Sequence, residues 1–282
     1  MESRILKPVL AVYVAFFILF LYGPFIVLTI LSFQQGPEGG PQFPIVEWST
    51  YWYRHIFGMT EASRVAPLPI GQAMLRSLTL AFATMVTSTV LGVMSAQAFR
   101  KKFKGSGIVF YLIVLGMIVP GLLTGLGVAL VAKNILNVDR HWWSTAFVQH
   151  VVYTFPFAFL VMLAILNRFD SSVEEASWSL GVSPLKTFRK VTFPLIFPGV
   201  LSAMLFAFTL SYDEFSRTLL SSNEQTLPLA IYGTFSVEIH PNIFAFGVLT
   251  TLFSFSLLAV YAILMTLSVR RAKKLAIQED IA

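Results

Sequence analysis

The chain contains no cysteine and few charged residues. Because none of its 282 residues is cysteine, disulfides, thiolate metal sites and cysteine nucleophiles are excluded. Charged residues make up 12% of the sequence and hydrophobic residues 56%, whereas an average soluble domain carries roughly 25% charged residues. This deficit leaves too little polar surface to cover a water-soluble globule. The composition therefore indicates an integral membrane protein.

The sequence motifs of metal-binding and phosphate-binding sites are also missing. The histidines are scattered, and none has a partner at metal-ligand spacing, so we expect no metal site: His55, His141, His150 and His240. No G-x-x-x-x-G-K-[ST] sequence occurs, so the chain lacks an ATP-binding phosphate loop of its own. A membrane-embedded enzyme would need a catalytic constellation within the spans. A channel would need a filter segment, and neither stands out.

Six apolar stretches are long enough to cross a bilayer, which takes roughly 20 residues. They cover residues 8–33, 75–99, 108–132, 142–166, 195–220 and 243–269. We expect each to be a helix, because hydrocarbon offers no partner for open backbone groups. The first is longer than the apolar region of a signal peptide, about 7–15 residues, and it lacks an A-x-A-like site, so we interpret it as an uncleaved span. Residues 1–282 are thus predicted to form one all-α transmembrane domain.

Basic residues cluster in alternate segments between these spans. The rich set includes both chain ends and holds Arg4, Lys7, Arg100, Lys101, Lys102, Lys104, Arg168, Lys186, Arg189, Lys190, Arg270, Arg271, Lys273 and Lys274. The opposite set holds only Arg54, Arg64, Arg76, Lys133 and Arg140. The positive-inside rule therefore predicts six crossings with both termini in the cytoplasm. The net charge of +6 then reflects membrane topology, and we expect no nucleic-acid partner.

Turn and helix-breaking residues interrupt the apolar pattern. The first outside loop begins with a turn-rich linker at residues 36–41. It continues into aromatic residues that suit a short helix at the headgroup level: Trp48, Tyr51, Trp52 and Tyr53. Helix-breaking prolines predict kinks in the third, fourth and fifth spans, at Pro120, Pro156, Pro194 and Pro198. Gly121 and Gly125 form a G-x-x-x-G, which is weak evidence for a packing face.

The segment 168–194, between the fourth and fifth spans, has helical signals of its own. Ser172 followed by Glu175 fits a capping box, and Glu174 lies where the helix dipole favours a carboxylate. Gly181 stands where a left-handed residue would end the helix. Apolar or small residues recur at helical spacing before it: Val173, Ala176, Ser177 and Leu180.

A second short helix is predicted after Gly181. Ser183 and Pro184 suit its N-cap and first position. Its apolar side holds Leu185, Phe188 and Val191, while its basic residues remain in water. The segment is thus two short amphipathic helices hinged at a glycine. These patterns alone fit equally a hairpin that rests on the bilayer surface.

The residues of this segment resemble a known family motif. Glu175-Ala176-Ser177, three further residues, Gly181 and then 188–194 resemble the EAA loop of permease subunits in binding-protein-dependent type I ABC importers. The resemblance extends over essentially the whole chain, and the stretches 208–215 and 226–232 are most similar to the spermidine/putrescine branch. Two positions depart from the pattern, because Ser177 replaces an alanine and Phe193 replaces a leucine.

The resemblance implies a type I importer permease fold, no catalytic residue in this chain, and a loop that docks on a separate ATPase. The docking residues it implies are Ser172, Glu174, Glu175, Ala176, Ser177, Leu180, Gly181, Ser183, Pro184 and Phe188. ATP and Mg would be bound by a pair of partner ATPases. Further implied partners are a second, different permease chain and a periplasmic substrate-binding protein, in a bacterial inner membrane. Polyamines are the leading solute, with opines, amino acids, quaternary amines and ferric iron as alternatives.

Two carboxylates fall within the fifth apolar stretch. Charged groups at membrane depth are costly and usually face the protein interior or water. Arg217 could pair with Asp213 or with Glu214 at helical spacing, but one arginine cannot neutralise both. We therefore expect at least one carboxylate to face the solute pathway or a partner subunit. The predicted pathway residues, in the outer half of the membrane, are Tyr212, Asp213 and Glu214.

Overall fold

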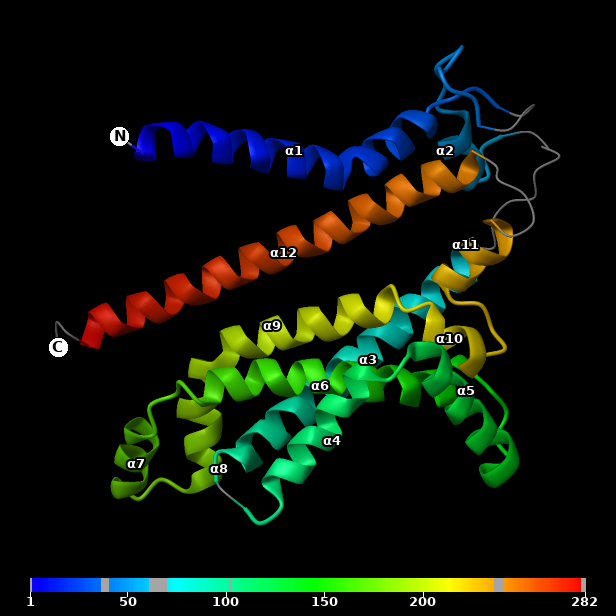
Figure 1. Cartoon of the computed structure of the whole chain (residues 1–282). Helices are drawn as coiled ribbons and strands as arrows, with labels where there is room; N and C mark the ends of the chain where they lie inside the picture. Colours follow the sequence, from blue (N-terminus) through cyan, green and yellow to red (C-terminus); the bar gives the residue numbers. More distant parts are fainter. Residues whose placement is uncertain (1, 37–40, 61–69, 102, 236–240, 280–282) are drawn as a thin grey trace. The chain divides into compact units, whose positions relative to one another are not determined.

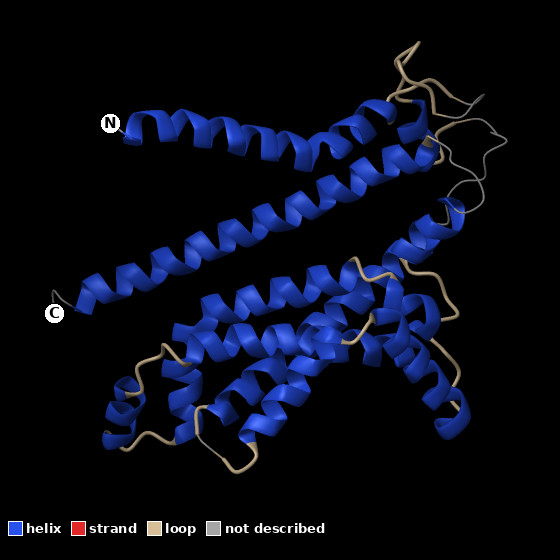
Figure 2. Cartoon of the chain, viewed as in Figure 1, coloured by secondary structure: helices blue, strands red, loops and turns tan. Residues whose placement is uncertain are grey.

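A computed structural model describes residues 2–36, 41–60, 70–101, 103–235 and 241–279. Figure 2 shows helices joined by loops, with no strand element among these residues, as expected for an all-α protein. Within these described ranges, five helices are long and apolar enough to cross a membrane, or six if one bent pair counts as a single span. Most of the predicted linker at 36–41 lies outside the described residues, as do Arg64, Lys102 and His240.

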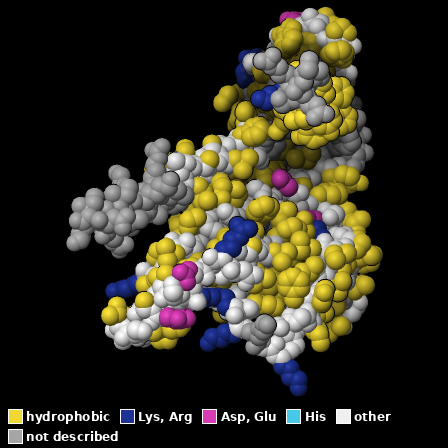
Figure 3. Space-filling view, turned by 60° about the vertical axis from the view of Figure 1, so that its left-hand side comes forward, with side chains coloured by type: hydrophobic (Ala, Val, Ile, Leu, Met, Phe, Trp, Pro, Cys, Tyr) yellow, Lys and Arg dark blue, Asp and Glu magenta, His cyan; other side chains and the backbone are white. Residues whose placement is uncertain are grey.

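The chain divides into two compact units. The first comprises residues 1–69 and 231–258, and the second residues 70–230 and 259–282. Hydrophobic side chains cover much of the face shown in Figure 3, the surface expected of helices that face lipid. In α1 (Glu2–Leu31), for example, Phe16 and Phe20 are 68% and 73% exposed.

In the first unit, the aromatic loop after α1 packs inward. The predicted short helix is present as α2 (Tyr51–Ile56). Trp52 is 1% exposed and packs against Ala245, near the start of α12 (Asn242–Glu279). The expectation that Trp52 anchors the loop at the headgroup level is therefore wrong, because its ring is enclosed by protein. Trp48, in contrast, is 65% exposed.

The second unit is built on three helices that lie side by side, α3 (Ile70–Phe99), α6 (Phe147–Leu166) and α9 (Phe193–Tyr212) (Figure 1). Their contact surfaces hold small, fully buried residues, among them Ala96, Ala158 and Ala203. Such residues let helix backbones approach closely where lipid provides no hydrophobic driving force. The fourth apolar stretch is helical over Trp142–Leu166, as predicted, and the π-helical turn η2 (Trp142–Ala146) precedes α6.

The third apolar stretch is bent. It consists of α4 (Ser106–Ile118) and α5 (Gly121–Val131), which meet at an angle of 105°. Val119 and Pro120 between them are extended, because proline disfavours helical backbone in the residue before it. The sequence predicts one helix over 108–132 that kinks at Pro120; the structure instead has two helices that end and begin next to this proline, so the prediction of a continuous helix is wrong. The π-helical turn η1 (Ala132–Leu136) follows α5.

The fifth span also differs from the prediction. α8 (Pro184–Thr187), the π-helical turn η3 (Phe188–Thr192) and α9 form one span from Pro184 to Tyr212. The second predicted loop helix is therefore the beginning of this span, which ends at Tyr212 and not at Leu220. Two short helices follow, α10 (Ser216–Ser221) and α11 (Leu227–Phe235).

Candidate functional site

The first helix of the predicted coupling loop is α7 (Ser172–Ser179). Its first N–H, from Ser172, donates to the Asp170 carboxylate at 2.9 Å, and this hydrogen bond lowers the pKa of Asp170. The predicted capping box is wrong, because the N-cap residue is Ser171 and its side chain makes no capping bond. The Ser171 carbonyl already accepts the N–H of Glu175 at 3.1 Å, which places Ser172 inside the first turn.

The end of α7 is a Schellman motif. The N–H of Gly181 donates to the Trp178 carbonyl at 2.9 Å, and that of Val182 to the Ser177 carbonyl at 3.2 Å. These two bonds satisfy carbonyls that the helix leaves without partners, and they need a left-handed residue between them. Gly181 supplies it with φ of 78°, so the predicted hinge is confirmed.

A side-chain hydrogen bond closes this hinge. The hydroxyls of Ser177 in α7 and Thr187 in α8 lie 2.9 Å apart, and Thr187 is 1% exposed. Alanine at position 177 could not make this bond. The departure of Ser177 from the EAA pattern therefore has a structural role, since it fixes the angle between α7 and α8.

Most of the predicted docking residues are exposed on the loop. Those exposed are Ser172, Glu175, Ala176, Leu180, Gly181, Ser183 and Pro184, and those partly buried are Ser177 and Phe188. Four apolar side chains are also exposed, which we name the coupling surface: Val173 (41%), Trp178 (46%), Leu180 (84%) and Leu185 (78%). Clustered exposed apolar side chains mark an interaction site for protein or membrane.

Glu174 is the exception, since its side chain points inward. Its carboxylate oxygens lie 2.7 and 3.0 Å from the two terminal nitrogens of Arg100, which follows the last residue of α3. The hydroxyl of Thr192 in η3 also donates to it. Burial raises the pKa of Glu174, but hydrogen bonds from Arg100 and Thr192, with the charge of Arg100, outweigh burial and hold this pKa below its usual range. The prediction that Glu174 is a docking residue is therefore wrong.

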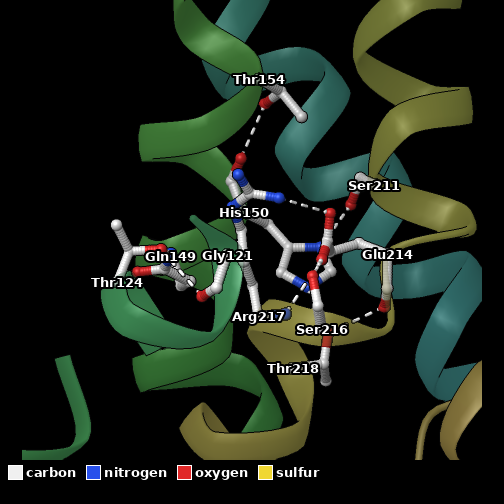
Figure 4. A network of polar contacts seen from close by, with 10 residues as sticks. All are labelled: Gly121, Thr124, Gln149, His150, Thr154, Ser211, Glu214, Ser216, Arg217 and Thr218. Carbon is white, nitrogen blue, oxygen red and sulfur yellow. Dashed lines mark hydrogen bonds and ion pairs between the residues drawn. The ribbon is translucent and has the colours of Figure 1, made fainter. Parts of the chain in front are cut away.

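A second polar network lies at the other end of the α3–α6–α9 bundle, where α5 and α10 are found (Figures 1 and 4). Glu214 and Arg217 form a buried ion pair at 2.9 Å. The Glu214 carboxylate also accepts the backbone N–H of Arg217 at 2.9 Å and the hydroxyl of Ser216 at 2.8 Å. It thus stabilises the first turn of α10, and the Arg217 guanidinium lies 3.6 Å from the ring centre of Tyr153.

The predicted pathway residues have three different environments. Glu214 is buried in its ion pair, and Tyr212 is 4% exposed and stacked on Phe208 with 5.9 Å between ring centres. Asp213 is exposed. Because α9 ends at Tyr212, the two carboxylates belong to the turn between α9 and α10, and the prediction that they lie within a continuous helix is wrong.

His150 joins α6 to this network, a role that scattered histidines in the sequence did not indicate. The Thr218 hydroxyl donates to the Glu214 carbonyl at 2.9 Å, so its oxygen accepts from Nε2–H of His150 at 2.8 Å. Nδ1 then accepts from the Ser211 hydroxyl at 2.7 Å. In the sequence, this role could have been recognised from two adjacent polar residues within an apolar span, Gln149 and His150.

Gly121 and Gly125 of α5 complete this end of the unit. A Cβ on Gly125 would come within 2.6 Å of the Arg217 carbonyl oxygen, and one on Gly121 within 2.5 Å of the Ser216 hydroxyl. Glycine at both positions therefore lets α10 lie directly against α5. The G-x-x-x-G pair is a packing face within the unit.

Comparison with known proteins assigns the family. Residues 88–274 match the model of the family described as binding-protein-dependent transport system inner membrane component. This match covers more than half of the chain, and the chain belongs to that family. It is therefore a multi-pass permease subunit of an inner membrane transport system, and the expectation of a transport role is confirmed.

Individual relatives are transport permeases. The chain is 28% identical to the putrescine transport system permease protein PotI of Escherichia coli strain K12 over 239 residues, 82% of this chain and 81% of PotI. It is 29% identical to the spermidine/putrescine transport system permease protein PotC of the same strain over 249 residues, 86% of this chain and 88% of PotC.

Solved structures of low sequence identity share the fold. A chain of a bacterial alginate ABC transporter, crystallised in complex with its alginate pentasaccharide-bound periplasmic protein, superposes with a TM-score of 0.67 at 16% identity. The superposition covers 97% of this chain and 96% of that chain. The predicted type I importer permease fold is confirmed.

Proposed function

We propose that this chain forms one half of the solute pathway of a polyamine-importing ABC transporter and receives force from a separate ATPase through the coupling surface. Similarity to PotI and PotC supports a polyamine as solute. The observation that carries the docking proposal is that four apolar side chains are exposed on a loop whose backbone is fixed from several sides. The second half of the pathway is a different permease chain, and ATP and Mg are bound by the paired ATPases.

The composition of α7 favours a protein partner over the bilayer surface. Helices that lie on membranes carry lysine and arginine on their polar face, which attract anionic lipids. α7 contains Glu174 and Glu175 and no basic residue. Glu175 is exposed beside the coupling surface, where it would be repelled by anionic lipid but could pair with a basic residue of the ATPase.

The arrangement of the second unit supports a cytoplasmic position for the loop. Figure 1 shows α7 and α8 at one end of the α3–α6–α9 bundle, and α5 and α10 at the other. α4 begins near the first end and α5 lies at the second, which supports counting the bent pair as one crossing in the proposed topology. With six crossings, the positive-inside rule favours an orientation in which both termini and α7 lie in the cytoplasm, and this orientation is part of the proposal.

Asp213 is the residue best placed to meet a cationic solute. It is an exposed carboxylate at the outer end of α9, and Glu214 beside it is already neutralised by Arg217. Desolvating an ammonium group is favourable only if a counter-charge replaces its water. An exposed carboxylate at the pathway supplies that charge, and the periplasmic binding protein supplies the first selection among solutes.

The docking proposal is tested with Leu180→Gln, which removes the most exposed leucine of the coupling surface. Leu136→Gln is the matched control, because Leu136 is 62% exposed at the opposite end of the unit. Both variants are co-expressed with the second permease and the ATPase and purified in detergent. We expect Leu180→Gln to insert normally but retain less than about a tenth of the ATPase, since hot-spot residues at interface centres typically cost 2 kcal/mol or more. Full retention by Leu180→Gln would contradict docking through this surface.

A further inference from the structure

The coupling loop is tied to a helix with which it shares no chain connection. Its ends continue into α6 and α9, whereas α3 ends at Phe99, and Arg100 lies 74 residues before Glu174 in the sequence. The connection to α3 is made by Arg100, whose two terminal nitrogens contact the two carboxylate oxygens of Glu174. Such a two-point contact fixes orientation as well as distance.

Arg100 is itself held in place by its surroundings. One of its terminal nitrogens also donates to Oε1 of Gln97 at 3.2 Å, one turn back in α3. Its guanidinium carbon lies 5.2 Å from the centre of the Phe169 ring, at the start of the loop. The side chains of Arg100 and Glu174 are 20% and 8% exposed, so water screens their attraction only weakly.

Glu174 connects three elements at once. One of the two oxygens that contact Arg100, Oε1, also accepts the Thr192 hydroxyl, so the end of α3, α7 and η3 meet at a single carboxylate. The neighbouring Glu175 is exposed on the outer side of α7. The two adjacent glutamates therefore differ in role, one facing the bundle and the other facing a partner.

We infer that Arg100 is a positioning residue for transport, which makes the coupling loop move together with α3. The inference rests on the proposed function, because it assigns a consequence to force applied at the coupling surface. Without the ion pair, α7 would remain attached to α8, η3 and α9 through the chain and the hydrogen bonds of Ser177 and Thr192. Among the described residues no other hydrogen bond or ion pair would tie it to α3, so α7 could move while α3 stayed in place. ATP hydrolysis would then proceed with little solute movement.

The test uses charge reversal in the assembled transporter, with its ATPase, second permease and binding protein. Arg100→Glu and Glu174→Arg each place like charges together, and the double variant Arg100→Glu/Glu174→Arg restores an ion pair in reverse. Lys101→Glu is the matched control, since it makes the same charge change at the adjacent exposed residue. The measurement is the number of putrescine molecules transported per ATP hydrolysed in proteoliposomes.

We expect each single reversal to assemble with the ATPase but to lower this ratio about tenfold, and the double variant to recover at least half of it. Lys101→Glu should keep the wild-type ratio. A wild-type ratio in Arg100→Glu, or no recovery in an assembled double variant, would overturn the inference. If the charge-reversal variants do not assemble with the ATPase, the same ratio is measured for Arg100→Lys and Thr192→Val, because both substitutions keep the charge balance. A wild-type ratio in both overturns the inference as well.

The outcome also separates this inference from the proposed function. If the wild-type chain neither retains the ATPase nor transports putrescine, the proposed function itself fails. If the wild-type complex is coupled and Arg100→Glu couples equally well, only the role of Arg100 is lost. A structural defect alone would lower the amount of assembled complex and the rate of ATP hydrolysis. The complexes that do form would still transport the wild-type number of putrescine molecules per ATP.

Discussion

Gly125 and Gly127 of α5 are two residues apart and have very different surroundings. A Cβ at Gly125 would approach the backbone carbonyl oxygen of Arg217 to 2.6 Å, whereas a Cβ at Gly127 would meet nothing within 4 Å. Alanine is favoured over glycine in helix interiors by about 0.8–1.0 kcal/mol at either position. The comparison of Gly125→Ala with Gly127→Ala therefore isolates the cost of the steric clash.

The expected loss of stability depends on which atom the new Cβ at Gly125 would contact. A backbone carbonyl oxygen in the first turn of α10 cannot rotate away as a side chain can, so α5 and α10 must separate or shift. Overpacking of this kind costs about 1–3 kcal/mol. Gly127→Ala should then be unchanged or slightly more stable than the wild type. We expect Gly125→Ala to be less stable than Gly127→Ala by about 1–3 kcal/mol.

The assay is thermal unfolding of the two variants in the same detergent. Unfolding is measured as the loss of the monodisperse peak in size-exclusion chromatography. On the scale of about 2–4 °C per kcal/mol for domains of 150–250 residues, Gly125→Ala should unfold roughly 2–12 °C below Gly127→Ala. Equal midpoints, or a lower midpoint for Gly127→Ala, would refute the direct contact between α5 and α10.

Two further predictions concern the coupling loop and the pathway. Gly181→Ala adds a methyl group where nothing lies within 4 Å, so its cost comes only from the left-handed backbone at φ of 78°, about 1–2 kcal/mol. We expect a chain that inserts and binds the ATPase but transports less putrescine per ATP, and an unchanged ratio would mean that the hinge angle is unimportant. Asp213→Asn keeps the shape of an exposed side chain and removes its charge. It should lower putrescine uptake about tenfold in assembled complexes, because removing one partner of a charge-assisted hydrogen bond typically costs about 1.5–3 kcal/mol, whereas wild-type uptake would remove Asp213 from the mechanism.

The sequence predicted features that depend on local backbone chemistry. The departure from a straight helix at Pro120 and the left-handed Gly181 both follow from what proline and glycine permit in a chain, whatever packs around them. The positions of the spans follow from the length of apolar runs, and Trp142–Leu166 agrees at both ends.

Features that depend on distant partners were not predictable in this way. Hydropathy continued through Tyr212 to Leu220, but the Glu214 carboxylate binds the first turn of α10 and so starts a new helix. Likewise, Glu174 and Glu175 are equivalent in an argument from the helix dipole. Only the position of Arg100 at the end of α3 decides which of the two is buried.

The two polar networks of the second unit are connected by α9. Near the beginning of this helix Thr192 donates to Glu174, and near its end Ser211 bonds to His150. At 1.5 Å per residue the two bonds are about 28 Å apart along the helix axis. Between them α9 packs through small buried residues such as Ala203 and Ala207 against α3 and α6. Because interiors packed this closely resist deformation, a displacement of the coupling loop should carry α9 and α3 with it as one body. We therefore expect the solute pathway to open by movement of this unit against its neighbours, with both networks intact.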